Sequence, residues 1–153
     1  MNIIIREYKM SDEGGVKRCI GELKKFESQF DPDYFTSEDS IEKLFSDIKN
    51  GKIFVAESEN GIVAFISVVI ENKNDELIVS KVDTVYISDF VVLPECRGMG
   101  IGHKLVKEVE NFARTRNIKY LKLRVFSESE KTVGFYHELG FFDYETTMLK
   151  ELK

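Results

Sequence analysis

The chain of 153 residues contains no tryptophan, two prolines, two histidines and two cysteines. Cys19 and Cys96 provide neither a disulfide framework nor a CxxC metal pair, so we expect two reduced thiols. We expect no metal, because two histidines without an HExxH motif are a poor basis for a metal site. The apolar runs are far too short to cross a bilayer, so we expect no membrane partner.

The start of the chain, MNIIIREYK, has charged side chains soon after a short apolar stretch. It lacks the charged beginning, the long apolar middle and the small-residue cleavage site of a signal peptide, so we expect a cytoplasmic protein. The length and the 42% hydrophobic composition suit a single compact domain over residues 1–153.

The net charge of −5 conceals two segments of opposite charge. Eight acids and three bases lie from Glu22 to Asp47, whereas eight bases and two acids lie from Arg97 to Arg124. The first segment could attract a cation and the second a polyanion, or both could be solvated helix faces. We do not expect a nucleic-acid partner, because the chain as a whole is acidic and the basic segment overlaps a glycine-rich turn.

Apolar periodicity predicts alternating strands and helices. We expect strands over residues 2–8, 52–57, 62–70, 77–93, 120–126 and 141–149, with a hairpin at Asn60-Gly61. We expect helices over residues 11–30, 36–50, 100–116 and 127–139, with capping boxes at Thr36-x-x-Asp39 and Ser127-x-x-Glu130. This order predicts an α/β fold whose sheet is antiparallel at first and has a parallel crossover around the glycine-rich turn.

The most informative stretch covers residues 85–105, VYISDFVVLPECRGMGIGHKL. It reads as an apolar strand, a proline, an arginine with three alternating glycines, and the first turn of a helix. Such a turn leaves backbone N–H groups bare at the positive end of a helix, which suits a phosphate-bearing ligand. The alternative is a turn whose glycines only permit positive φ, but this does not explain why the arginine stands beside them.

Two other glycine-rich loops fit the sequence poorly. A P-loop needs Gly-x-x-x-x-Gly-Lys-[Ser/Thr], and the chain has no such run. A dinucleotide fold needs Gly-x-Gly-x-x-Gly after the first strand and an acid about twenty residues further on. Here the glycines come late in the chain, and Lys122 stands at the position of the acid.

Residues 97–102, Arg-Gly-Met-Gly-Ile-Gly, resemble the pyrophosphate loop of the GNAT N-acetyltransferase superfamily, as does their place between a strand and a helix. A second landmark, Tyr136-x-x-x-Gly140-Phe141, resembles the end of a short helix in the same family. The order of elements resembles that family from about residue 3 to residue 149. The resemblance implies the GNAT fold, a central mixed, mostly antiparallel sheet flanked by helices, with a parallel crossover at the acetyl-CoA site.

The resemblance also implies acetyl-CoA as the acetyl donor and a primary amine as the acceptor. Backbone N–H groups of the glycine loop would hold the CoA pyrophosphate, and the strand before the loop would bind the pantetheine arm. Ser129 stands where many relatives have an asparagine that contacts the cofactor. The expected cofactor-binding residues are Phe90, Val91, Val92, Arg97, Gly98, Met99, Gly100, Ile101, Gly102, His103 and Ser129.

Acetyl transfer requires a neutral amine and a proton or other stabilisation for the leaving thiolate. Tyr136 aligns with the family tyrosine that donates to the CoA sulfur; without the surrounding motif it would be read as a core aromatic. Asp89 stands on the strand before the loop, and we expect it to bind the amine or take its proton. Its alternative role is to cap a turn or pair with a lysine.

The segment from Phe26 to Phe35 is aromatic and acidic together. Because acids attract an ammonium group and aromatic rings can surround it, we expect Phe26, Glu27 and Phe30 to bind the acceptor together with Asp89. This composition suggests a small cationic acceptor such as a polyamine, an aminoglycoside or an amino-acid derivative. The same features suit a lysine side chain of a peptide or protein, and they also suit a Phe-rich core beside a solvated loop.

Two further alternatives belong to other classes of protein. A non-catalytic acyl-CoA-binding module could keep this fold without activity. A hydrolase with a Cys96 nucleophile and a histidine, His103 or His137, lacks a recognisable orienting group. Many GNAT relatives form homodimers, and the sequence does not decide whether this chain does.

Overall fold

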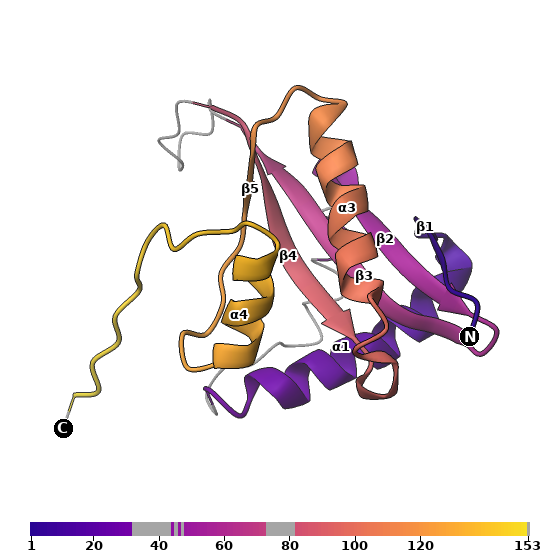
Figure 1. The fold of residues 1–153 in the computed structure, drawn as a ribbon, viewed down its shortest axis with the longest axis horizontal. Coiled ribbons are helices and arrows are strands. Elements are labelled where there is room, and N and C mark those ends of the chain that lie inside the picture. The colour runs from indigo at the N-terminus through magenta and orange to yellow at the C-terminus, as the bar shows by residue number, and fades with distance from the viewer. Residues whose placement is uncertain (32–43, 45, 47, 73–81, 153) are drawn as a thin grey trace.

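The computed structural model describes residues 1–31, 44, 46, 48–72 and 82–152. Five strands form one sheet in the order β1-β2-β3-β4-β5 (Figure 1). Neighbouring strands from β1 to β4 run antiparallel, and β5 runs parallel to β4. The prediction of an α/β fold with a mixed, mostly antiparallel sheet is therefore confirmed. The strands are β1 (Ile4–Glu7), β2 (Gly51–Ser58), β3 (Gly61–Glu71), β4 (Thr84–Val92) and β5 (Tyr120–Lys122).

Helices cover both faces of this sheet. β3 is buried along Ile62–Val68 without alternation, which requires cover on its two faces. Helix α1 (Glu13–Glu27) and helix α3 (Ile101–Arg114) both pack on β3, and Figure 1 shows α3 lying across one face. A third helix, α4 (Glu130–Glu138), places the rings of Phe135 and Tyr136 beside Phe90 of β4. Among the helices described, none is both long and apolar enough to cross a membrane.

The apolar stripe of α3 anchors the core. Leu105, Val109 and Phe112 are buried as their spacing predicts, and Val106 is buried with them. The Phe112 ring meets the Phe54 ring of β2 edge-on, with centroids 6.3 Å apart. This packing holds the crossover helix on the sheet and so fixes where α3 begins.

Three short 3₁₀ turns complete the described elements: η1 (Met10–Asp12), η2 (Ile48–Asn50) and η3 (Pro94–Cys96). The predicted hairpin is present: Glu59 and Asn60 join β2 to β3, and Gly61, the first residue of β3, has a φ of +100°. Most of the predicted helix over 36–50, with its Thr36-x-x-Asp39 capping box, lies outside the described residues. Residues 73–81 of the next predicted loop and strand also lie outside them.

Several predicted boundaries were wrong. Helix α1 begins at Glu13, after η1, and ends at Glu27. The N-cap of α4 is Ser129, so the predicted capping box that began at Ser127 does not open this helix. Both errors arise because other polar residues stand near the true N-cap, and their side chains have the same preference for capping a helix.

The predicted strand over 141–149 is absent from this chain's own sheet. Residues 141–152 have no regular secondary structure, and residues 142–152 are exposed. The predicted strand over 120–126 is also short, because β5 ends at Lys122. A strand forms only where a neighbour satisfies its backbone N–H and C=O groups, and alternation in the sequence does not report whether the same chain supplies that neighbour.

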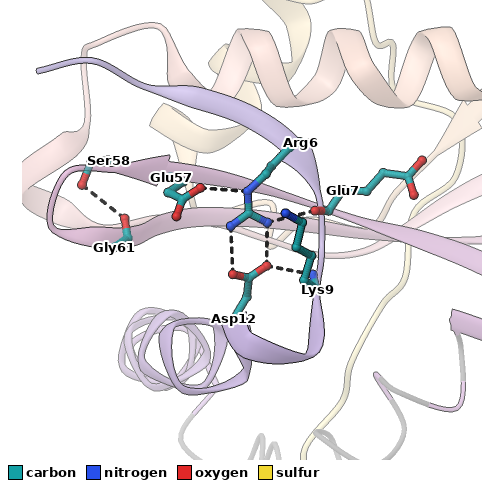
Figure 2. Close-up of polar contacts among 7 residues, drawn as sticks. All are labelled: Arg6, Glu7, Lys9, Asp12, Glu57, Ser58 and Gly61. Atoms are coloured by element: carbon teal, nitrogen blue, oxygen red, sulfur yellow. Dashed lines mark hydrogen bonds and ion pairs between the residues drawn. The ribbon is translucent and has the colours of Figure 1, made fainter.

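A network of charged groups joins β1, η1 and β2 (Figure 2). The Arg6 guanidinium donates to both Asp12 oxygens, at 2.7 and 2.9 Å, and its Nε donates to Glu57 Oε2 at 2.8 Å. The Lys9 N–H donates to Asp12 Oδ2 at 2.8 Å. The hydrogen bond from Arg6 is the main reason that the pKa of Asp12 lies below its ordinary value of 3.8. Asp12 thereby ties the entry of α1 to the sheet edge.

We predict that Asp12→Asn lowers the free energy of unfolding by about 2 kcal/mol at neutral pH, because the Arg6 fork loses its charged partner. The folded-state pKa of Asp12 is depressed, so its stabilisation is present above the unfolded pKa and is lost as the pH falls through the folded pKa. The difference between wild type and variant should therefore stay constant at neutral and mildly acidic pH, and shrink in urea titrations as the pH falls below the ordinary value of 3.8.

Glu110→Gln is the matched control, since it removes an exposed ion pair to Arg114 of 3.0 Å on α3. Its effect should be below about 0.5 kcal/mol. A loss in Asp12→Asn that stays constant over the whole pH range would contradict an electrostatic origin.

Candidate functional site

β4 positions the site, because it parts from β5 partway along its length. Their parallel pairing covers only Thr84–Tyr86 of β4 and Tyr120–Lys122 of β5. The next six residues of β4, Ile87–Val92, have no described strand beside them on the β5 side. Figure 1 shows β4 and the chain after β5 diverging. Backbone groups along this part of β4 can therefore pair with an extended ligand, as they would with an added strand.

A β-bulge fixes Asp89 at the point of divergence. Ser67 of β3 pairs with Asp89 and Val68 pairs with Ile87, so Ser88 is the extra residue on β4. The Ser67 hydroxyl donates to Asp89 Oδ2 at 3.0 Å and accepts from the Asp89 N–H at 3.1 Å. Bulges re-aim side chains, often beside active sites. One buried hydroxyl thus holds both the backbone and the carboxylate of Asp89.

The turn after β4 exposes the start of α3. Gly98 and Gly100 have φ angles of +75° and +73°, which L side chains rarely adopt. Gly100 is the N-cap of α3 and has no side chain to accept from the first helical N–H groups. The first backbone bond across this cap runs from the Lys104 N–H to the Gly100 carbonyl, at 3.2 Å. The preceding N–H groups, at the positive end of the helix dipole, form the kind of site that favours a phosphate.

Gly102 has a different role from Gly98 and Gly100. A Cβ at Gly102 would lie 3.0 Å from Phe135 Cζ and 3.2 Å from Phe90 Cζ. The rings of Phe90 and Phe135 have centroids 6.0 Å apart, and the His103 ring meets Phe135 edge-on at 5.2 Å. The missing side chain at Gly102 therefore lets β4, α3 and α4 converge, which brings the glycine turn next to the tyrosine helix.

Tyr136 on α4 lies in this aromatic cluster. Its ring centroid is 6.3 Å from that of Phe90, 5.4 Å from that of Phe135 and 5.5 Å from that of Phe141. Burial raises the pKa of Tyr136 well above its ordinary value. The phenol is therefore protonated at neutral pH and can donate a hydrogen bond or a proton close to β4.

A second group of predicted residues meets at the end of α1. The buried Oε2 of Glu27 has no hydrogen-bond partner among the described residues. Burial first, and the negative charge of Asp89 second, raise the pKa of Glu27 to about 7. The Phe30 ring stacks on Phe126 at 5.6 Å and lies 5.2 Å from Phe26. Two coupled carboxylates and three aromatic rings thus come together from α1, β4 and the chain after β5.

Four other residues predicted to bind the cofactor lie along β4, the glycine turn and the start of α3. The side chains of Val91 and Ile101 are buried in the core, so a ligand could reach only their backbone. Arg97 is exposed, and its Nε donates to the Val92 carbonyl at 3.0 Å. Met99 is also exposed.

Ser129 begins α4 and is buried. Its hydroxyl donates to Thr132 Oγ1 at 2.7 Å. Ser129, which replaces the expected asparagine, is the N-cap, and its hydroxyl bonds to the first turn of α4.

Sequence reasoning missed Ser67, Phe126 and Phe135. Ser67 carried a usable signal, because it interrupts an apolar run over residues 62–70. Phe135 precedes the motif tyrosine and could have been included with it. Phe126 gave no signal, since only the fold brings it to Phe30.

Neither thiol is placed as a nucleophile would need to be. Cys19 and Cys96 are free and buried, and burial raises the pKa of Cys19 to about 11. A thiol nucleophile needs solvent access, and both thiols are buried. Within the described part of the chain, no group of three or more His, Cys, Asp or Glu side chains could hold a metal ion.

A strand that parts from its parallel neighbour beside a glycine turn and an open helix N-terminus suits an extended ligand that carries a phosphate. The sequence model of the acetyltransferase (GNAT) family matches residues 21–141. The chain therefore belongs to the GNAT family, whose members transfer acetyl groups to amines.

Individual relatives agree with this assignment. The chain is 29% identical over 153 residues to a thialysine N-epsilon-acetyltransferase of Sus scrofa, with 91% of this chain and 84% of the relative covered. A mutant of the BH1408 protein from Bacillus halodurans has a TM-score of 0.87 at 23% identity, covering 98% of this chain and 99% of the other. AAC(6')-Iy, solved with the bisubstrate analog CoA-S-monomethyl-acetylneamine, has a TM-score of 0.73 at 15% identity, covering 100% and 99%.

We predict that Gly100→Ala weakens acetyl-CoA binding about tenfold, because the left-handed conformation costs an L residue roughly 1–2 kcal/mol. Isothermal titration calorimetry with acetyl-CoA measures the change. Gly21→Ala is the matched control: it lies on α1, has open space around it and no positive φ, and should leave the affinity unchanged. Equal affinities of wild type and Gly100→Ala would show that the turn geometry does not govern binding.

Proposed function

We propose that this chain transfers an acetyl group from acetyl-CoA to the primary amine of a small cationic acceptor, by direct attack in a ternary complex. The observation that carries the proposal is the pair of coupled carboxylates, Glu27 and Asp89, among aromatic rings and beside the parted edge of β4. Carboxylates attract an ammonium group, and aromatic faces favour a cation above them. Polyamines, aminoglycosides and amino-acid derivatives share this chemistry.

The names of relatives support the same class of acceptor. Thialysine is an amino-acid derivative with a terminal amine, and it is the substrate named for the relative from Sus scrofa. The analog bound by AAC(6')-Iy joins CoA to acetylneamine. Both therefore favour a small amine over a protein substrate for this chain.

The donor half of the site supports acetyl-CoA as the co-substrate. The N–H groups from Gly98 to His103 would bind the pyrophosphate, and Arg97 would add a positive charge nearby. The pantetheine arm would pair with the free edge of Phe90, Val91 and Val92. A backbone N–H near Val92 would polarise the thioester carbonyl.

Three proton movements accompany the transfer. The ammonium group gives a proton to a carboxylate, and the neutral nitrogen forms a bond to the acetyl carbon while the carbon–sulfur bond breaks. Glu27 suits proton acceptance, because its raised pKa of about 7 lets it exchange a proton at neutral pH. Asp89, held by Ser67, would bind and orient the cation. Tyr136 would give its proton to the leaving thiolate, and the proton that the acylated nitrogen loses on becoming the amide would return to the Tyr136 phenolate.

The first experiment measures CoA release from acetyl-CoA by thiol detection across polyamines, aminoglycosides, amino acids and lysine-containing peptides. Release that depends on a small cationic amine supports the proposal. Release only with peptides would replace it with peptide N-acetylation. Acetyl-CoA binding without release for any acceptor would favour the binding module, and no binding would contradict the donor site.

We predict that Tyr136→Phe lowers kcat at least about tenfold while the Kd for acetyl-CoA hardly changes, because the ring remains and only the proton donor is lost. Steady-state kinetics and calorimetry measure the two quantities separately. Tyr120→Phe, an exposed tyrosine on β5, is the control and should retain wild-type kcat. Undiminished turnover in Tyr136→Phe would remove this residue from the mechanism.

We predict that kcat/KM rises with pH through an apparent pKa near 7 as Glu27 loses its proton. Glu27→Gln should remove this limb and lower kcat/KM. Asp89→Asn should move the limb to lower pH, because it removes the negative charge that raises the pKa of Glu27. A limb that stays in place in both variants would belong to another group, such as the acceptor amine itself.

A further inference from the structure

Ser67 is a polar residue in the most deeply buried part of the sheet. It stands on β3 between Ile66 and Val68, which are 0% and 1% exposed, and it is itself only 4% exposed. A buried hydroxyl costs free energy unless its hydrogen-bonding positions are occupied. A serine at this place in an apolar strand therefore needs a reason other than packing.

The Ser67 hydroxyl uses its hydrogen bonds on one residue of the neighbouring strand. It accepts from the Asp89 N–H at 3.1 Å and donates to Asp89 Oδ2 at 3.0 Å. A backbone amide can only donate, so the single hydroxyl hydrogen is left for the carboxylate. One oxygen thus holds the backbone and the side chain of Asp89 together, which restrains the carboxylate relative to its own strand.

The β-bulge decides which face of the sheet Asp89 occupies. Residues that pair across two strands lie on the same face, and successive residues of one strand alternate between faces. Asp89 pairs with Ser67. Ile87 pairs with the next residue of β3, so Asp89 and Ile87 lie on opposite faces although they are two positions apart. In a regular strand they would share a face, so the extra residue, Ser88, moves Asp89 to the other side.

The two faces have different neighbours. Phe90 lies on the face that α3 covers, since its ring would contact a side chain at Gly102. Asp89 lies on the opposite face, where its negative charge raises the pKa of Glu27 on α1. A register without the extra residue would turn the Asp89 carboxylate toward α3 and away from Glu27. The bulge is therefore what lets the two carboxylates share one site.

Two carboxylates that share a site repel each other, so Asp89 gains by turning away from Glu27. The hydrogen bond from Ser67 to Oδ2 opposes this movement. A carboxylate that is already oriented loses less conformational freedom when it binds an ammonium group, which favours binding. The restraint therefore acts on the affinity for a cation that lies between α1 and β4.

We propose that Ser67 is a positioning residue of the acceptor site, whose hydroxyl holds the Asp89 carboxylate on the α1 face, where Asp89 and Glu27 together meet the acceptor ammonium. This inference rests on the proposed function for the identity of the cation. The placement of the carboxylate rests on the hydrogen bonds and on the register of the two strands. Ser67 acts through Asp89 and does not itself contact the acceptor.

Steady-state kinetics with an amine that the wild type acetylates test the consequence for the reaction. Ser67→Ala should raise KM for the amine at least about fivefold, while the Kd for acetyl-CoA stays unchanged. Ser67→Thr keeps a hydroxyl and should restore most of the loss. In the Asp89→Ala background, Ser67→Ala should change kcat/KM by less than about twofold, because no carboxylate remains to be held.

Ser58→Ala is the matched control. Ser58 is also buried, at 7% exposure, and its hydroxyl also makes two bonds: it donates to the Gly61 carbonyl at 3.2 Å and accepts from the Asn60 N–H at 3.1 Å. It lies at the β2–β3 hairpin, away from Asp89. Urea unfolding shows what each serine contributes to stability, and Ser58→Ala should leave KM for the amine at the wild-type value.

Carbon-13 NMR of the carboxyl groups tests the placement of Asp89 without any acceptor. Glu27 should titrate near pH 7 in the wild type and in Ser58→Ala. In Ser67→Ala it should titrate at lower pH, because the released Asp89 carboxylate turns away from the like charge.

Two sets of outcomes separate this inference from the proposed function. An unchanged Glu27 titration in Ser67→Ala, an unchanged KM, or losses that add fully in the double variant with Asp89→Ala would overturn the role of Ser67. A wild type that acetylates no amine would contradict the proposed function instead, and the NMR titration would then decide whether Ser67 holds the carboxylate beside Glu27.

Discussion

The interrupted ladder between β4 and β5 is the constraint on which the rest of the structure depends. After Tyr86 the parallel pairing stops, and the two strands part. A parallel sheet would normally continue, since unpaired backbone groups are costly in an interior. Here the parting is held open by Phe90 and Phe135, which pack together over Gly102. A side chain at Gly102 would crowd both rings, so this contact depends on the glycine.

Burial has different consequences for the ionisable groups around this opening. The same loss of water that raises the pKa of Tyr136 and keeps it protonated raises the pKa of Glu27 into the neutral range. Asp12 shows the opposite case, because hydrogen bonds from the Arg6 guanidinium stabilise the charged carboxylate and lower its pKa. The hydrogen-bonded carboxylate of Asp12 stabilises the fold at the β1 edge of the sheet. The carboxylate of Glu27 lies near Asp89, and its buried Oε2 has no hydrogen-bond partner among the described residues.

Local patterns predicted the parts of the molecule that local forces determine. The glycine turn, the stripe of α3 and the hairpin at Asn60-Gly61 follow from backbone preference and periodicity, and all are found. The bulge at Ser88 and the contact of Phe30 with Phe126 could not be predicted, because they arise when distant segments pair. The residues after Phe141 show the limit of local patterns. Their apolar and polar side chains alternate as in a strand, but the sheet does not include them.

β4 carries Asp89 as a side chain and Val92 as a free backbone edge, three residues apart on one extended segment. At about 3.3 Å per residue, covalent geometry sets the spacing between these two points at roughly 10 Å. The strand therefore keeps the distance between Asp89 and Val92 constant, and movement of a loop does not change it. A site for a larger or smaller molecule must therefore differ in the residues that face β4. Those residues can change while the spacing of Asp89 and Val92 stays the same.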